Sequence, residues 1–381
     1  MTSALQRVPG HRFAHIDALR GVAAAVVVWM HGSEVFARLP GMDGRGVWLH
    51  HFADSVNLGR VGVVAFFLIS GYVIPHSLRG PLGHGLRQFA IRRFFRLFPA
   101  FWLSIPLAYA AVWMLWQRPF DLGDVLANAT MVPVVFGREA ALGLYWTLET
   151  ELVFYCLVTL LFIFGVNRKP LVLASIVLGL LAVFVLQKVP LLPRPAVSQW
   201  AEMPFNLAIM LAGTLCRYAS DDARRSGVSL AARRQADTIA VVVLTAVAIL
   251  AAAHIPFGRS DAAQIFGISN LVGIALFIAT LLFWRRPPDA VVWMGSISYS
   301  LYLLHPVVLY PLAWVLTYQV VWPAPLGVGS LLVVLGAGSL ALAALSYRWV
   351  ELPAINHARR LTATPAGQAR TAWTTQQNRQ P

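Results

Sequence analysis

The chain has 381 residues, of which 58% are hydrophobic and 12% charged, and its mean hydropathy is +0.66. This composition excludes an ordinary soluble domain, because several apolar runs reach the ~20 residues that cross a bilayer. The net charge of +14 would suit a nucleic-acid-binding protein, but most of the 30 Lys and Arg residues fall in segments that are cytoplasmic if the N-terminus is inside, a bias typical of membrane topology. We therefore predict no nucleic-acid partner and a multi-pass membrane protein.

The hydropathy pattern predicts an all-α fold with ten membrane-spanning helices and both termini in the cytoplasm. We place the helices at approximately 15–37, 60–78, 98–116, 144–164, 170–187, 203–218, 237–254, 264–284, 293–318 and 326–349. Residues 1–14 precede one membrane domain, 15–352, and the tail 353–381 is predicted to be disordered. No cysteine spacing typical of a metal site occurs, so we expect no metal.

The first predicted helix carries two residues that are costly inside a bilayer, Arg20 and His31. Eleven positions separate them, which is three turns plus roughly 20°, so both leave the same helix face about 16 Å apart along the axis. This arrangement suits a long anionic ligand that has its charged end at one membrane surface and its reactive end deeper inside.

Two carboxylates accompany that pair. Asp17 lies three residues before Arg20 and is expected to pair with it. Either this pair is a structural contact at the cytoplasmic helix end, or Arg20 holds an anionic ligand or fixes the active-site helix. Glu34 follows His31 by three residues and predicts a base-plus-orienter pair, in which the carboxylate raises the basicity of the imidazole.

Arg93 and Arg96 lie in a basic stretch, Arg92 to Pro99, which we interpret as an inner loop ahead of the third helix. On a helical turn the two arginines share a face, and arginine binds phosphate bidentately. Plain positive-inside anchoring explains the same residues equally well.

The segment from Trp146 to Tyr155 should enter the membrane from the outer side, which puts Glu151 at roughly the depth of His31. Glu149 points about 200° away from Glu151, so we predict that Glu151 faces the site and Glu149 lies nearer the surface. An intramembrane carboxylate needs a partner or a water-filled cavity.

Tyr299, Tyr302 and His305 follow one another at three-residue steps on the ninth predicted helix, and Pro306 can break the helix ladder there. A kinked helix with satisfied polar groups is the competing interpretation. Ser70, in the second helix beside Gly71, is read as a residue that lets helices pack closely rather than as a nucleophile, because no strand–elbow context surrounds it.

These stretches, in this order, resemble the signatures of the acyltransferase-3 family of integral membrane acyltransferases over about residues 15–348. Thr147 stands where the family has Ser, and Glu151 matches the family's motif Glu. Many members carry Asp at the position of Val64, a departure that concerns handling of the acceptor. The matching stretches are 15–21 with His31, 66–71, 93–96, 146–155 and 298–305.

The resemblance implies a location in the bacterial cytoplasmic (inner) membrane. It also implies transfer of an acyl group, most commonly acetyl, from cytoplasmic acyl-CoA to a hydroxyl of a glycan, which can be the O-antigen of lipopolysaccharide, exopolysaccharide or another cell-surface polysaccharide. It implies that Arg20, Arg93 and Arg96 meet the CoA phosphates and that the thioester lies near His31. His31 is then the general base, oriented by Glu34 or Glu151, while Trp146, Ser70, Tyr299, Tyr302 and His305 support the substrates. The stand-alone type, without a fused esterase-like domain, is expected.

Three alternatives stay open at this level. Intramembrane Arg, His and Glu also mark transporters and flippases of polar substrates, although no internal repeat is evident in the sequence. An outer-facing glycan is the favoured acceptor, with a glycosylated small molecule such as a macrolide as the alternative. Direct transfer and an acyl-histidine intermediate both remain compatible with the residues.

Overall fold

The computed structural model describes residues 13–40, 42, 44–188, 198–222, 229–257, 260–318 and 327–363, and in these ranges it contains helices and no strand. The long helices are α1 (Ala14–Ala37), α3 (Leu58–Val73), α4 (Leu82–Ala108), α6 (Trp146–Ile163), α7 (Pro170–Leu186), α9 (Met203–Asp222), α10 (Leu230–Ala252), α12 (Asp261–Phe283), α14 (Ser298–Tyr318) and α15 (Val328–Ser346). The shorter α-helices are α2 (Trp48–Ser55), α5 (Leu122–Ala129), α8 (Ser198–Ala201), α11 (His254–Phe257), α13 (Asp289–Ser296) and α16 (Leu352–Leu361). Five 3₁₀ or π segments connect or extend them: η1 (Pro75–Ser77), η2 (Tyr109–Met114), η3 (Pro133–Phe136), η4 (Gly143–Tyr145) and η5 (Tyr347–Glu351).

Each predicted span coincides with one of the ten long helices. Within the described ranges, 7 helical stretches are long and apolar enough to cross a membrane, and α7 is a shorter apolar helix. The prediction of an all-α, polytopic membrane protein is therefore confirmed. The count of ten spans and the cytoplasmic position of both termini remain predictions.

Helix α4 corrects the interpretation of the basic stretch. The residues from Arg92 to Pro99 lie inside α4 and do not form a loop ahead of a span. Pro99 and Pro106 are both internal to this helix, which changes to π geometry at Tyr109. Proline inside a membrane helix is tolerated where neighbouring groups and local π adjustment satisfy the freed carbonyls.

Two further boundaries differ from those predicted. A break at Ile297 separates α13 from α14, where one continuous span was expected. At the other end, α15 continues through the π segment η5 into α16, so helix extends to Leu361 and past the predicted start of the disordered tail. The remainder of that predicted tail, residues 364–381, lies outside the described residues, as does segment 1–12.

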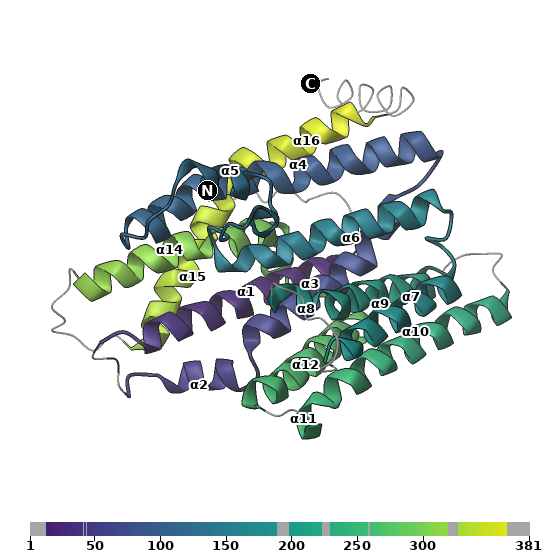
Figure 1. The fold of residues 1–381 in the computed structure, drawn as a ribbon, viewed down its shortest axis with the longest axis horizontal. Coiled ribbons are helices and arrows are strands. Elements are labelled where there is room, and N and C mark those ends of the chain that lie inside the picture. Colours follow the sequence, from purple (N-terminus) through teal and green to yellow (C-terminus); the bar gives the residue numbers. More distant parts are fainter. Residues whose placement is uncertain are drawn as a thin grey trace, which may run out of the picture.

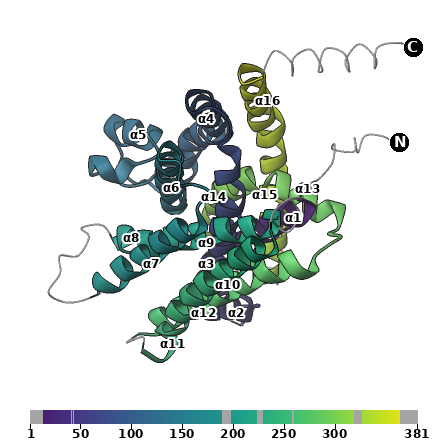
Figure 2. The same ribbon diagram turned by 90° about the vertical axis from the view of Figure 1, so that its right-hand side faces the viewer.

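Helix α1 runs through the middle of the bundle with α3 beside it (Figure 1). It packs against α3, α13, α14 and α15, and most of its apolar side chains are buried. Helices α4, α5 and α6 gather on one side of the molecule, while α7, α10 and α12 lie on another (Figure 2). The charged side chains of α1 remain partly exposed, with 27% for Arg20, 31% for Asp17 and 35% for Glu34.

The Ser70–Gly71 pair lies where α3 and α9 approach most closely. A Cβ built on Gly71 would lie 1.6 Å from the carbonyl oxygen of Met210, and one built on Gly213 would lie 2.2 Å from that of Leu68. Small residues permit such backbone contact between membrane helices. The packing interpretation of this stretch therefore has a direct geometric cause.

We expect Gly71→Ala to lower the free energy of unfolding by about 1–3 kcal/mol, because the added methyl meets backbone that cannot move aside cheaply. Thermal unfolding in detergent micelles, followed by tryptophan fluorescence, measures this. Gly179→Ala in α7 is the matched control, since a Cβ there has nothing within 4 Å. Equal melting temperatures for the two variants would contradict the close-packing argument.

Candidate active site

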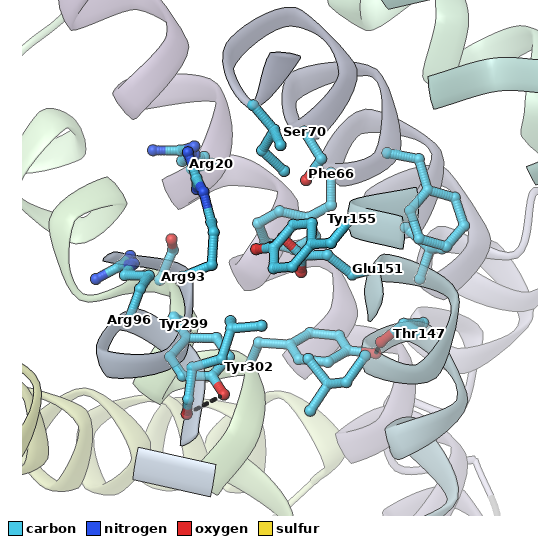
Figure 3. Close-up of a pocket in the computed structure, with 16 residues that line it drawn as sticks. Arg20, Phe66, Ser70, Arg93, Arg96, Thr147, Glu151, Tyr155, Tyr299 and Tyr302 are labelled. Atoms are coloured by element: carbon cyan, nitrogen blue, oxygen red, sulfur yellow. Dashed lines mark hydrogen bonds between the residues drawn. The ribbon is translucent and has the colours of Figure 1, made fainter. Parts of the chain in front are cut away.

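Three arginines from two helices line one cavity, which we call the triple-arginine cavity. Arg20 comes from α1, and Arg93 and Arg96 come from α4; the cavity has an empty volume of about 750 Å³. Figure 3 shows the three arginines on one side, with Glu151 and Tyr155 of α6 across from them. The remaining predicted residues that line it are Ser70, Tyr299 and Tyr302, together with the motif residue Thr147.

Each of the three arginines is held differently. Arg20 lies 3.4 Å from Asp17, with 27% of its side chain exposed. Arg93 donates to Ser77 Oγ at 3.0 Å, and its guanidinium lies over the rings of Phe89 and Tyr155. Its Nε has no hydrogen-bond partner among the described residues. Arg20 thus both contacts Asp17, as predicted, and faces the shared cavity.

Arg96 is anchored by a residue that the sequence reasoning missed. Its Nη1 donates to Glu351 Oε2 at 2.7 Å, and the Glu351 side chain is completely buried. Ser300 donates its hydroxyl proton to the second oxygen of Glu351, and Ser300 Oγ also lies 2.9 Å from Ser346 Oγ. Glu351 ends the π segment η5, beyond the last predicted span, and the signal for it was a lone carboxylate directly after an apolar run.

The two glutamates of α6 have separate partners. Glu151 accepts a hydrogen bond from Tyr155 at 2.7 Å and faces the triple-arginine cavity. Glu149 is buried rather than near the surface, where it was predicted, and it accepts from Trp200 Nε1 at 3.1 Å. Glu151 thus faces a cavity, but that cavity is lined by the three arginines and not by His31.

His31 of α1 and His305 of α14 form a direct pair. His31 Nδ1 lies 2.9 Å from His305 Nε2, while the ring centroids are 5.1 Å apart and the planes differ by 14°. This combination places the rings edge to edge in nearly one plane, as an in-plane hydrogen bond requires.

A second contact of His305 determines which atom donates. His305 Nδ1 lies 2.8 Å from the carbonyl oxygen of Tyr302, which can only accept, so Nδ1 carries a proton. His305 is fully buried, and burial favours the neutral imidazole. Its Nε2 is then an acceptor, so His31 donates from Nδ1 and retains a lone pair on Nε2.

The hydrogen-bond partner of His31 is therefore His305, and not Glu34 or Glu151, the two carboxylates that we predicted would orient it. Glu34 binds Arg38 Nη2 at 2.8 Å, one turn further along α1, and Glu151 binds Tyr155. The three-residue spacing from His31 to Glu34 suggested the wrong partner because spacing relates residues on one helix, whereas His305 arrives from another.

His31 and Glu34 border two further cavities. One, which we call the Arg60 cavity, has an empty volume of about 1000 Å³ and is lined by residues that include Asn57, Arg60, Trp146, Glu202 and Phe266. The other, which we call the Arg138 cavity, has an empty volume of about 1310 Å³ and is lined by residues that include Arg118, Arg138, Glu139, His305 and Tyr310.

Tyr302 lies between the arginine side and the histidine side. Its ring and Val63 line both the triple-arginine cavity and the Arg60 cavity. The Tyr302 hydroxyl lies 2.8 Å from Thr147 Oγ1 and donates to the carbonyl oxygen of Leu144 at 3.2 Å. Arg20 thus lines the triple-arginine cavity and His31 lines the Arg60 and Arg138 cavities, with Tyr302 at the boundary between the first two.

Ion pairs hold together the loop segment 121–139, which contributes Arg138 and Glu139 to the lining of the Arg138 cavity. Asp121 and Asp124 form a capping box at the start of α5, and Arg138 binds both carboxylates at 2.9 Å and 3.1 Å. The backbone N–H of Asp124 and the Arg138 guanidinium lower the pKa of Asp121 below its ordinary value. Arg138 is therefore neutralised by its own loop.

Comparisons with known proteins agree with this arrangement. A family model described as an acyltransferase domain matches residues 13–348. The chain is 27% identical over 165 residues to a protein named as a membrane-bound transacylase, BcsY, from Komagataeibacter xylinus, covering 39% of this chain and 37% of that protein. It is 31% identical over 109 residues to protein 2 in the picA locus of Rhizobium radiobacter, covering 28% of this chain and 49% of that protein. The matches thus span less than half the length of either relative, and no solved structure matches.

Proposed function

Because the chain belongs to the acyltransferase-3 family and is a membrane acyltransferase, we propose that it moves an acetyl group from cytoplasmic acetyl-CoA to a hydroxyl of a cell-surface glycan. The proposed location is the bacterial inner membrane. The observation that carries the proposal is the His31–His305 pair, since it leaves a basic nitrogen beside cavities that can admit an acceptor.

The donor would bind through its phosphates at the triple-arginine cavity. Arginine forks form charge-assisted, often bidentate hydrogen bonds with phosphate. The pantetheine arm would then run along α1 toward His31, a reach of roughly 16 Å along the helix axis. Tyr302 lies on this path, so its ring must turn or shift for the thioester to reach His31.

The proposed reaction is a direct transfer. His31 Nε2 takes the proton from the acceptor hydroxyl as the oxygen attacks the thioester carbonyl, and the imidazolium is stabilised by its hydrogen bond to His305. The carbon–sulfur bond then breaks, and the CoA thiolate takes the proton from His31. The ester and free CoA are the products, and the enzyme returns to its starting state.

Mass spectrometry of surface glycans tests the function. Cells that carry the gene should show glycans heavier by an acetyl group than those of cells that lack it, and restoring the gene should restore the mass. With detergent-solubilised protein, thiol release from acetyl-CoA should depend on added glycan. Identical glycan masses with and without the gene would contradict the proposal.

A variant of Arg93 tests the proposed acetyl-CoA site. Arg93→Gln is expected to raise the KM for acetyl-CoA about tenfold with little change in kcat, because a charge-assisted hydrogen bond contributes about 1.5–3 kcal/mol. Steady-state kinetics over a range of acetyl-CoA concentrations measures this. Arg87→Gln on the same helix is the control, since Arg87 is exposed. An unchanged KM in Arg93→Gln would remove Arg93 from the donor site.

A further inference from the structure

We propose that the Arg60 cavity is the acceptor subsite and that it selects an uncharged sugar unit. This inference rests on the proposed function, because it assigns the acceptor of that same reaction. The Arg60 cavity and the Arg138 cavity both border His31, and each is large enough for a sugar unit.

The orientation of the His31 ring favours the Arg60 cavity. His305 lines the Arg138 cavity, and it holds Nδ1 of His31 through the in-plane hydrogen bond. Nε2 is separated from Nδ1 by Cε1 in the imidazole ring, and its lone pair is directed well away from the Nδ1–H bond, so the basic nitrogen points away from His305. The Arg60 cavity borders His31 without including His305 in its lining. A hydroxyl there meets the nitrogen that can accept its proton.

The lining has the chemistry that a sugar requires. Trp146 and Phe266 are aromatic, and the Trp146 ring offers a flat apolar surface that can pack against the C–H face of a pyranose, while Asn57 and Glu202 offer hydrogen-bonding groups for its hydroxyls. Arg60 is 9% exposed, and its Nε has no hydrogen-bond partner among the described residues. Aromatic side chains together with a few polar groups in one cavity are typical of small-ligand sites.

The charges of this cavity are internally compensated. Arg60 donates to Glu202 at 2.7 Å and to Asn206 at 2.9 Å, and its guanidinium lies over the Phe266 ring. Glu34 is paired with Arg38. A uronic acid or phosphate group would have to compete with Glu202 for Arg60, whereas a neutral hydroxyl can share the existing ion pair. The cavity therefore favours a neutral hexose over an anionic sugar.

The test uses the detergent-solubilised full chain and labelled acetyl-CoA. Surface glycans from the host are stripped of esters with mild alkali, cut to oligosaccharides and separated into neutral and acidic fractions by anion exchange. We expect the neutral fraction to accept label and the acidic fraction to accept little. Preferential labelling of the acidic fraction would overturn the selectivity, and no labelling of either fraction by the unmodified protein would instead overturn the proposed function.

Two matched variants locate the acceptor. Glu202→Gln should raise the KM for the neutral fraction about tenfold, because it removes one charge-assisted contact. The KM for acetyl-CoA should stay unchanged, which also shows that the variant is folded. Glu139→Gln in the Arg138 cavity is the control, since Glu139 is likewise ion-paired, with Arg118 at 3.2 Å.

The opposite pattern, a raised acceptor KM in Glu139→Gln and none in Glu202→Gln, would place the acceptor in the Arg138 cavity and leave the acyltransferase function intact. If Glu202→Gln fails to fold, Glu202→Asp tests the same contact, because it keeps the charge on a shorter side chain. An unchanged acceptor KM in a folded Glu202 variant overturns the assignment.

Discussion

Replacement of His31 by glutamine is expected to lower kcat for acetyl transfer by about 10²–10⁴-fold, which is the range for losing a general base. Glutamine can still donate a hydrogen bond to His305 Nε2, so the local packing is preserved while the basic nitrogen is lost. The KM for acetyl-CoA should change little, because the three arginines lie in a different cavity from His31. The loss should therefore fall on kcat.

The measurement is glycan-dependent thiol release from acetyl-CoA by purified protein, together with the melting temperature of each variant. His84→Gln is the matched control, since His84 is exposed on α4. The control should retain the kinetics of the unmodified protein. Full activity in folded His31→Gln protein would rule out His31 as the base and would direct attention to another proton acceptor in the cavities.

The helices were largely predictable because each long apolar run must satisfy its backbone internally in a membrane. The predicted helix boundaries were wrong where hydropathy does not distinguish a helix from a loop. Helix α4 begins well before its apolar part, because a basic stretch such as 92–99 can be helical as readily as an apolar one. In the same way, helix continues beyond 349 through a π segment that ends in a buried carboxylate.

Individual residues of the candidate site could be predicted from the sequence, but the contacts between them could not. Arg20, Arg93, Arg96, Glu151 and Tyr299 do share one cavity. Periodicity relates residues on a single helix, however, and the decisive contacts join different helices.

His31 and His305 are 274 positions apart, and Arg96 and Glu351 are 255 apart. Only the packing of α1 with α14, and of α4 with η5, brings these pairs together. The same limit explains the choice of Glu34 as orienting group, since it was the carboxylate within one turn of His31.

Replacement of His305 by leucine is expected to lower kcat about 10–100-fold while the KM for acetyl-CoA stays nearly constant. Leucine leaves the Nδ1–H of His31 without an acceptor, and an unsatisfied buried donor costs about 1–3 kcal/mol. That cost is largest when His31 carries the proton, which is the state that follows attack on the thioester. His305 is thus a positioning residue, which acts through His31.

Two comparisons separate this role from simple packing. His305→Gln keeps a carbonyl oxygen that can accept from His31, so it should recover part of the activity that leucine loses, whereas a packing defect would track melting temperature instead. A double variant, His31→Gln with His305→Leu, should be no slower than His31→Gln alone, because both changes affect one proton transfer and such effects are not additive. Additive losses in the double variant, or an unchanged kcat in folded His305→Leu protein, would contradict a positioning role for the hydrogen-bond chain from the Tyr302 carbonyl through His305 to His31. The inferred position of the acceptor depends on the same hydrogen bond, since it is the contact on Nδ1 that turns Nε2 toward the Arg60 cavity.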